Sequence, residues 1–140
     1  MYYKSMHSIH HVAVTASNFE NSLEFYQKLG FEILENRYVA EKKKKIALLQ
    51  LGNFKLELFW YDDLTDQPEQ RASVGNNVHE VGMKHFAIRV DSLEDVRKEL
   101  EDQGISFASE PANADINYQF CFIRDPDGIW IEYVQDDMHA

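Results

Sequence analysis

Two histidines and two glutamates of this 140-residue chain stand in sequence settings that suit a metal site. His11 and His85 each begin a short alternating apolar segment, while Glu57 and Glu132 interrupt the apolar runs FKLELFW and GIWIEYV. A carboxylate in such a run is costly to bury unless it is paired, protonated or bound to a metal. Two imidazoles and two carboxylates form a nitrogen and oxygen donor set that suits Ni²⁺, Co²⁺, Zn²⁺, Fe²⁺ or Mn²⁺.

The four residues occupy matching places in an internal repeat. The segment 11–31 aligns with 85–105 without a gap at an offset of 85 − 11 = 74, which places His11 over His85 and Gly30 over Gly104. The two glutamates were found separately and lie at nearly the same offset, 132 − 57 = 75. Agreement between the two offsets indicates a duplicated module.

Each copy has the pattern of a strand, a helix and three further strands. The first strands alternate, and an apolar stripe at helical spacing follows each of them. We predict helices over 18–29 and 92–103, with Asn18 and Ser92 as N-caps and a C′ glycine after each helix. The later strands are expected at 31–38, 45–51, 54–60, 105–109, 118–124 and 129–135.

The expected architecture is therefore an α+β fold of paired βαβββ modules. The modules span about 8–61 and 83–136 within one domain, residues 8–136, and loop 62–82 joins them. A polar connection of this length is often functional, commonly as a lid.

Alternation along the strands predicts which side chains share a face. One face of each first strand is wholly apolar and should pack under a helix. The opposite face carries a histidine, an alanine and a polar residue, and the same parity places an aromatic residue beside each glutamate. These cavity-facing sets are His11, Ala13, Thr15, Glu57 and Phe59 in the first copy, and His85, Ala87, Arg89, Trp130 and Glu132 in the second. By the same parity His10 faces the helix, so it is given no ligand role.

Composition narrows the class of protein. A net charge of −10 argues against nucleic acid or an anionic membrane as a partner. The single cysteine, Cys121, permits no intrachain disulfide and reads as a small core residue. No apolar run approaches the ~20 residues needed to span a bilayer, and the N-terminus lacks a signal-peptide pattern, so a cytoplasmic location is expected.

The ordered set of segments IHHVAVTASNFENSLEFYQKLGF, KLELF, KHFAIRVDSLEDV and RDPDGIWIEYV resembles the vicinal oxygen chelate superfamily, and within it glyoxalase I-like proteins. This group also includes bleomycin resistance proteins and dioxygenases. The resemblance implies a curled mixed β-sheet cup around one divalent metal per site, with Ni²⁺, Co²⁺ or Zn²⁺ first among the candidates. The ligands it implies are His11, Glu57, His85 and Glu132.

The resemblance also implies an activity. Glutamate at position 57 points toward glyoxalase I, which isomerises the hemithioacetal of a thiol and an α-oxoaldehyde to a 2-hydroxyacyl thioester. Either Glu57 or Glu132 would act as the catalytic base, with Glu132 slightly favoured. The alternatives are a non-catalytic binding or resistance protein and another metal-dependent member, such as an epimerase or dioxygenase. A homodimer is expected, with the metal site either within one chain or shared between two.

Two positions depart from the glyoxalase I pattern. Thr15 and Tyr61 stand where an arginine and an asparagine typically grip glutathione, which leaves the thiol cosubstrate open. Arg89 could anchor an anionic substrate or pair with a nearby acid. Phe59 and Trp130 are expected to line the cavity and contact a partly apolar substrate, or to serve in packing. The lysines at 42–45 read as a solvated hairpin, with contact to a negative ligand as the alternative.

Overall fold

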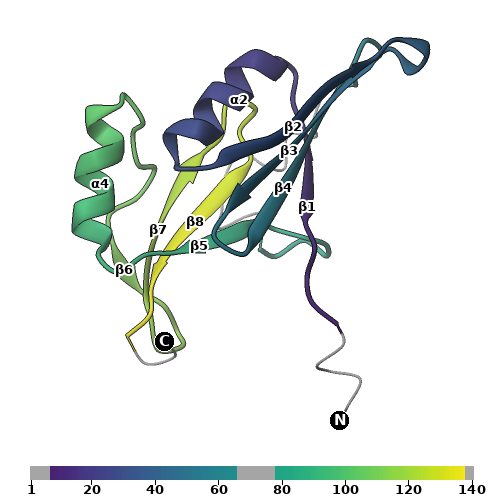
Figure 1. Cartoon of the computed structure of the whole chain (residues 1–140). Helices are drawn as coiled ribbons and strands as arrows, with labels where there is room; N and C mark the ends of the chain where they lie inside the picture. Colours follow the sequence, from purple (N-terminus) through teal and green to yellow (C-terminus); the bar gives the residue numbers. More distant parts are fainter. Residues whose placement is uncertain (1–6, 66–77, 138–140) are drawn as a thin grey trace. The chain divides into compact units, whose positions relative to one another are not determined.

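The structure is a computed structural model that describes residues 7–65 and 78–137. The chain divides into two compact units, Met1–Thr65 and Asp66–Ala140, and each unit has its own sheet and helix (Figure 1). Residues 66–77 of the expected joining loop lie outside the described residues.

The first unit contains a mixed sheet with the strand order β1-β4-β3-β2. β1 pairs in parallel with β4, while β4, β3 and β2 pair antiparallel in sequence. A helix follows β1 and contacts β4. The elements are β1 (Val12–Thr15), α2 (Phe19–Lys28), β2 (Glu32–Val39), β3 (Lys44–Leu51) and β4 (Phe54–Tyr61).

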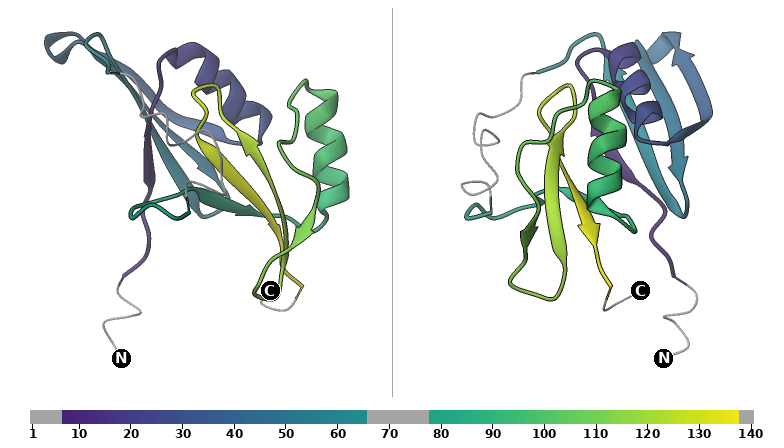
Figure 2. Two further views of the ribbon diagram at one scale, coloured as in Figure 1. Left: turned by 180° about the vertical axis from the view of Figure 1, so that it is seen from behind. Right: turned by 90° about the vertical axis from the view of Figure 1, so that its left-hand side faces the viewer.

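The second unit repeats this topology with the order β5-β8-β7-β6. β5 is parallel to β8, and α4 lies over one face of the sheet, in contact with β8 (Figure 2). The elements are β5 (Phe86–Arg89), α4 (Leu93–Asp102), β6 (Ala112–Asn113), β7 (Gln119–Arg124) and β8 (Trp130–Gln135). The expected α+β class and the paired βαβββ order are confirmed.

The strand predicted at 105–109 is wrong, because the second edge strand is the short β6. Ala108 donates one backbone hydrogen bond to the Phe122 carbonyl at 2.8 Å, and the Ser109 hydroxyl accepts the Phe122 N–H at 3.2 Å. A side chain thus takes the place of the backbone acceptor that a ladder needs. Pro111, which has no N–H to donate, follows before β6 begins.

Both helices begin and end as their sequences predict. The side chains of Asn18 and Ser92 accept hydrogen bonds from the backbone N–H groups of Asn21 and Asp95. At the C-terminal end of α2, Phe31 N–H reaches the Tyr26 carbonyl, and the repeat-related bond from Ile105 to Leu100 closes α4. Gly30 and Gly104 adopt φ values of +107° and +84° there, a conformation that costs glycine little.

The helix-facing sides of the two sheets form the cores. Val14, Leu56 and Leu58 are buried in the first unit, and Phe86, Ile88, Ile131 and Tyr133 are buried in the second. Cys121 is fully buried as expected, and burial raises the pKa of its thiol. Neither helix in the described residues has the length and apolar character that a bilayer crossing requires.

Two features distinguish the β2–β3 hairpin. β2 is one of the two edge strands of its sheet, is exposed along most of its length, and has a register shift between Ile33 and Glu35. The lysines at 42–45 are only partly a turn. A 3₁₀ helix, Ala40–Lys42, and Lys43 with φ +51° make the turn, whereas Lys44 and Lys45 belong to β3. The hairpin expected at 42–45 is therefore present, and the strand expected at 45–51 begins one residue earlier, at Lys44.

We expect Ser92→Ala to reduce the free energy of unfolding by about 1 kcal/mol, because the Asp95 N–H loses its acceptor. Urea unfolding followed by circular dichroism measures the change. Ser92→Asp is the control, since a carboxylate can accept the same bond. Equal stability of the alanine and aspartate variants would show that the cap contributes nothing.

Candidate metal-binding half-sites

His11 and Glu57 meet in the first unit. His11 directly precedes β1, and Glu57 lies on the neighbouring strand β4, where its register partner is Ala13. The small Ala13 side chain leaves room for the carboxylate on this face. The His11 Nε2 to Glu57 Oε1 distance is 3.5 Å, and the Glu57 side chain is 25% exposed.

His85 and Glu132 form the equivalent pair in the second unit. Ala87 is the register partner of Glu132, just as Ala13 is of Glu57. The His85 Nε2 to Glu132 Oε1 distance is 3.2 Å. Glu132 is buried, at 7% exposure, so His85 is the polar partner that accompanies a carboxylate removed from water.

His10 contacts His11, which the strand parity did not predict. The Nδ1 atoms of the two rings are 2.8 Å apart, and the rings meet edge to face. If His11 donates its Nδ1–H to His10, the His11 Nε2 keeps its lone pair on the side of Glu57. A metal-ligating histidine usually donates its second ring N–H to a nearby acceptor, most often a carboxylate, a carbonyl or water, and here His10 is in that place. The adjacent histidines in the sequence were the available signal, because strand alternation assigns residues to faces and does not predict a contact between sequence neighbours.

The donor atoms of each pair are spaced like two ligands of one ion. Two ligands at metal–ligand distances of about 2.1 Å lie roughly 3.0–3.4 Å apart in octahedral or tetrahedral geometry. The observed separations of 3.5 Å and 3.2 Å are close to that range. The residues therefore fit a divalent cation through imidazole nitrogen and carboxylate oxygen.

The structure brings the four expected ligands together as two His–Glu pairs, one in each unit. In residues 7–65 and 78–137 no cluster of three or more His, Cys, Asp or Glu side chains is placed to hold a metal ion. Each unit thus supplies two donors.

The remaining first-unit candidates lie near Glu57 on the same face of the sheet. Thr15 is exposed and is the register partner of Phe59. The rings of Phe59 and Tyr61 stack with centroids 6.0 Å apart. The ammonium of Lys44 lies 5.6 Å from the centre of the Phe59 ring and 6.0 Å from that of Tyr61. This group of two rings and a cation is a partly exposed surface further along β3 and β4, on the same face as Glu57.

The second-unit candidates are engaged differently. The Arg89 guanidinium donates to the Asp136 backbone carbonyl at 3.1 Å, so a carbonyl holds it at the end of β8. Trp130 is only 6% exposed, and the Arg124 guanidinium lies 4.0 Å from its ring centre. Trp130 therefore has extensive packing contacts within its own unit.

Phe122 was not singled out from the sequence, yet it adjoins the second pair. It is the register partner of Glu132, and its ring meets the His85 ring edge to face at 5.0 Å. Phe120 and Trp130 also contact Phe122 edge to face. The alternation in QFCFIR could have placed Phe120 and Phe122 on the face of Glu132. The surroundings of Glu132 are thus more aromatic than those of Glu57.

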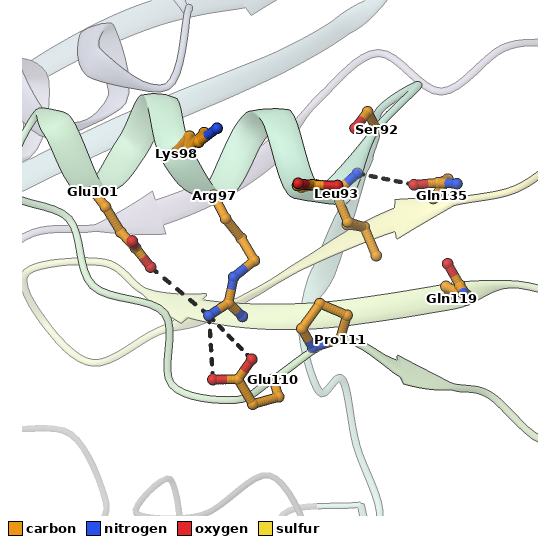
Figure 3. A pocket seen from close by; sticks show the side chains of 10 residues that line it. Ser92, Leu93, Arg97, Lys98, Glu101, Glu110, Pro111, Gln119 and Gln135 are labelled. Carbon is orange, nitrogen blue, oxygen red and sulfur yellow. Dashed lines mark hydrogen bonds and ion pairs between the residues drawn. The ribbon is translucent and has the colours of Figure 1, made fainter.

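A hollow of about 590 Å³ in the second unit lies beside α4 (Figure 3). Its central cation, Arg97, is already bound to the Ser109 carbonyl at 2.8 Å and to the carboxylates of Glu110 and Glu101 at 3.4 and 3.8 Å. Gln135 also lines it and accepts the Leu93 N–H. Since Gln135 and Glu132 differ in strand parity, this hollow lies on the opposite face of the sheet from Glu132.

Comparison with known proteins identifies the family. The sequence profile of the glyoxalase/bleomycin resistance protein/dioxygenase superfamily matches residues 8–133. The chain therefore belongs to this superfamily, as its sequence resemblance implied. The crystal structure of a glyoxalase family protein from Enterococcus faecalis has a TM-score of 0.78 and 33% identity, covering 96% of this chain and 99% of that chain. The fold is accordingly the glyoxalase-like α+β fold.

Two further relatives bear on activity. The uncharacterised protein YwkD of Bacillus subtilis is 34% identical over 129 residues, covering 89% of this chain and 94% of YwkD. Lactoylglutathione lyase of Neisseria meningitidis is 27% identical over 136 residues, covering 89% of this chain and 88% of the enzyme. The chain thus resembles both an enzyme of this superfamily and a protein without an assigned function.

The burial of Glu132 has a measurable consequence for stability. In protein freed of divalent ions, we expect Glu132→Gln to raise the free energy of unfolding by about 1 kcal/mol, because a neutral amide is less costly to bury than a carboxylate. Glu57→Gln is the matched control and should have a smaller effect, since Glu57 is more exposed. Chemical unfolding in the presence of chelator measures both. Destabilisation by Glu132→Gln would mean that pairing with His85 outweighs the burial cost.

Proposed function

We propose that the protein is a divalent-metal-dependent isomerase or lyase of the glyoxalase I type. Its substrate would be the hemithioacetal of an α-oxoaldehyde and a thiol, and its product the 2-hydroxyacyl thioester. The observation that carries the proposal is the repeated His–Glu pair, His11 with Glu57 and His85 with Glu132, at 3.5 and 3.2 Å. The similarity to lactoylglutathione lyases supports the choice of reaction.

The four side chains would hold one divalent ion, with Ni²⁺, Co²⁺ or Zn²⁺ as the first candidates. When bound, the ion would stabilise the negative charge that develops on the substrate oxygens during proton transfer. It would also balance the charge of Glu132, which lies among aromatic side chains with His85 beside it.

The chain itself must move a proton between neighbouring carbons. We assign this step to Glu132, which takes the proton from the carbon that bears sulfur and returns it to the former carbonyl carbon. The hydroxyl proton passes between the two oxygens, so the reaction gains and loses no atoms. The buried setting of Glu132 favours it over Glu57, because water competes less for a carboxylate on an enclosed face.

The proposal includes a cytoplasmic homodimer. Each unit provides two ligands, so a complete set requires two units, either from one chain or from two. Light scattering with and without the ion would measure the oligomeric state.

The first experiment is an isomerisation assay on protein loaded separately with Ni²⁺ and Zn²⁺. Methylglyoxal is offered with glutathione, with other low-molecular-weight thiols and with no thiol. We expect metal-dependent thioester formation with at least one thiol. Its absence with every thiol, in protein shown to contain metal, would contradict the proposed reaction and favour a binding protein or another activity of the superfamily.

Variants then test the two carboxylates. Glu132→Gln should retain the metal and lose at least about a hundredfold in kcat, as expected for removal of a general base. Glu57→Gln is the matched comparison and should retain more of kcat. Retained turnover by Glu132→Gln would exclude Glu132 as the base.

His10 provides a test of the metal ligands by binding alone. We expect His10→Ala to weaken Zn²⁺ binding about tenfold, because His11 loses the partner that orients its ring. Competition with a chromogenic chelator measures the affinity. His79→Ala is the control, since the structure places His79 in a turn. Equal affinity of the His10 variant and the wild type would mean that His10 does not position a metal ligand.

A further inference from the structure

The open face of the first unit's sheet contains a hollow of about 340 Å³ that ends at Glu57. β2 and β3 supply most of its lining residues, and Lys42 from the turn between them also lines it. Its volume falls within the usual range for small-molecule sites. All of its residues belong to one unit, so the first unit alone defines it.

The charges in this hollow are not balanced. Arg37 donates to Glu35 at 2.9 Å, and Glu57 faces His11, so these groups have polar partners. Lys42 and Lys44 also line the hollow. No carboxylate within salt-bridge distance of either lysine is seen in the described part of the chain. This excess of positive charge occurs in a protein with a net charge of −10.

Lys44 is the better placed of the two lysines. It is partly buried, and its ammonium lies over the rings of Phe59 and Tyr61, whereas Lys42 is exposed. Contact with aromatic faces restricts a flexible lysine without neutralising its charge. The Lys44 ammonium is therefore restricted in position and keeps its charge, so it can bind an anion.

The hollow also sets a distance between that charge and Glu57. Ile46 and Leu48 follow Lys44 on the same face of β3, and Leu48 is the register partner of Glu57. Four residues along a strand span about 13 Å. An anion at Lys44 would thus be separated from Glu57 by an apolar floor.

We propose that this hollow binds an anionic group of the substrate, a carboxylate or a phosphate, with Lys44 as its main contact. The inference rests on the proposed function in one respect, because it makes the thiol adduct an elongated anion whose reacting carbons lie at the Glu57 end. Lys44, rather than Thr15, then confers selectivity for the acidic end of the thiol.

Anion binding can be tested without turnover. The full-length protein, freed of divalent ions by dialysis, is titrated with inorganic phosphate and separately with succinate, while the methyl NMR signals of Ile46 and Leu48 are followed. We expect both signals to shift with at least one of the two anions. The anion that binds more tightly distinguishes a phosphate from a carboxylate site.

Lys44→Met should weaken this binding at least about tenfold, as expected for loss of a charge-assisted contact. Lys45→Met is the matched control: it removes the same charge from the next residue of β3, but Lys45 points to the helix side and binds Glu20 at 2.8 Å. Lys44→Arg should retain binding. Equal weakening by the two methionine variants, or the absence of shifts at Ile46 and Leu48 in the wild type, would overturn the proposal.

The outcomes separate this inference from the proposed reaction. Binding that depends on Lys44 in a protein with no isomerase activity would preserve the anion site and contradict the reaction. Turnover in a protein that binds neither anion would support the reaction and contradict the anion site.

Discussion

A carboxylate inside a β-sheet must recover, from its neighbours, the stabilisation it loses on leaving water. In both units a histidine supplies part of that stabilisation through the same local geometry. A parallel strand places an alanine opposite the glutamate. The histidine two residues before that alanine directs its Nε2 toward the carboxylate. The parallel register of the first and last strands therefore determines where the chemistry of each unit lies.

The duplicated modules preserve that geometry but surround it with different side chains. Glu132 has the rings of Phe122 and Trp130 on its face, whereas Glu57 has the aliphatic Leu48 as its register partner and is more exposed. The carboxylate of Glu132 is thus more fully removed from water than the carboxylate of Glu57. An apolar, enclosed carboxylate suits proton transfer, and a more open, positively charged surface suits recognition of an acidic group. Under the proposed function, the second repeat would serve the reaction and the first would serve binding.

Local patterns in the sequence were sufficient for the helices, their caps, the order of strands and the faces that carry His11, Glu57, His85 and Glu132. The strand expected at 105–109 is wrong because a contact between segments distant in the sequence decides the outcome. The segment lacks a ladder because the Ser109 hydroxyl takes the Phe122 N–H. This contact has no signature in a short window of sequence. The contact of His10 with His11 was missed because alternation assigns sequence neighbours to opposite faces, whereas the two rings meet just before β1 begins.

The edge strand β2 has a consequence for the behaviour of the protein in a crowded solution. An exposed edge presents unpaired backbone groups to other chains and invites fibril growth. Here the register shift between Ile33 and Glu35 breaks the regularity of the edge, and Glu32, Glu35 and Arg37 place charges along it. Both features hinder a second strand from adding in register. The strand that forms one wall of the anion-binding hollow is thus also built to resist aggregation.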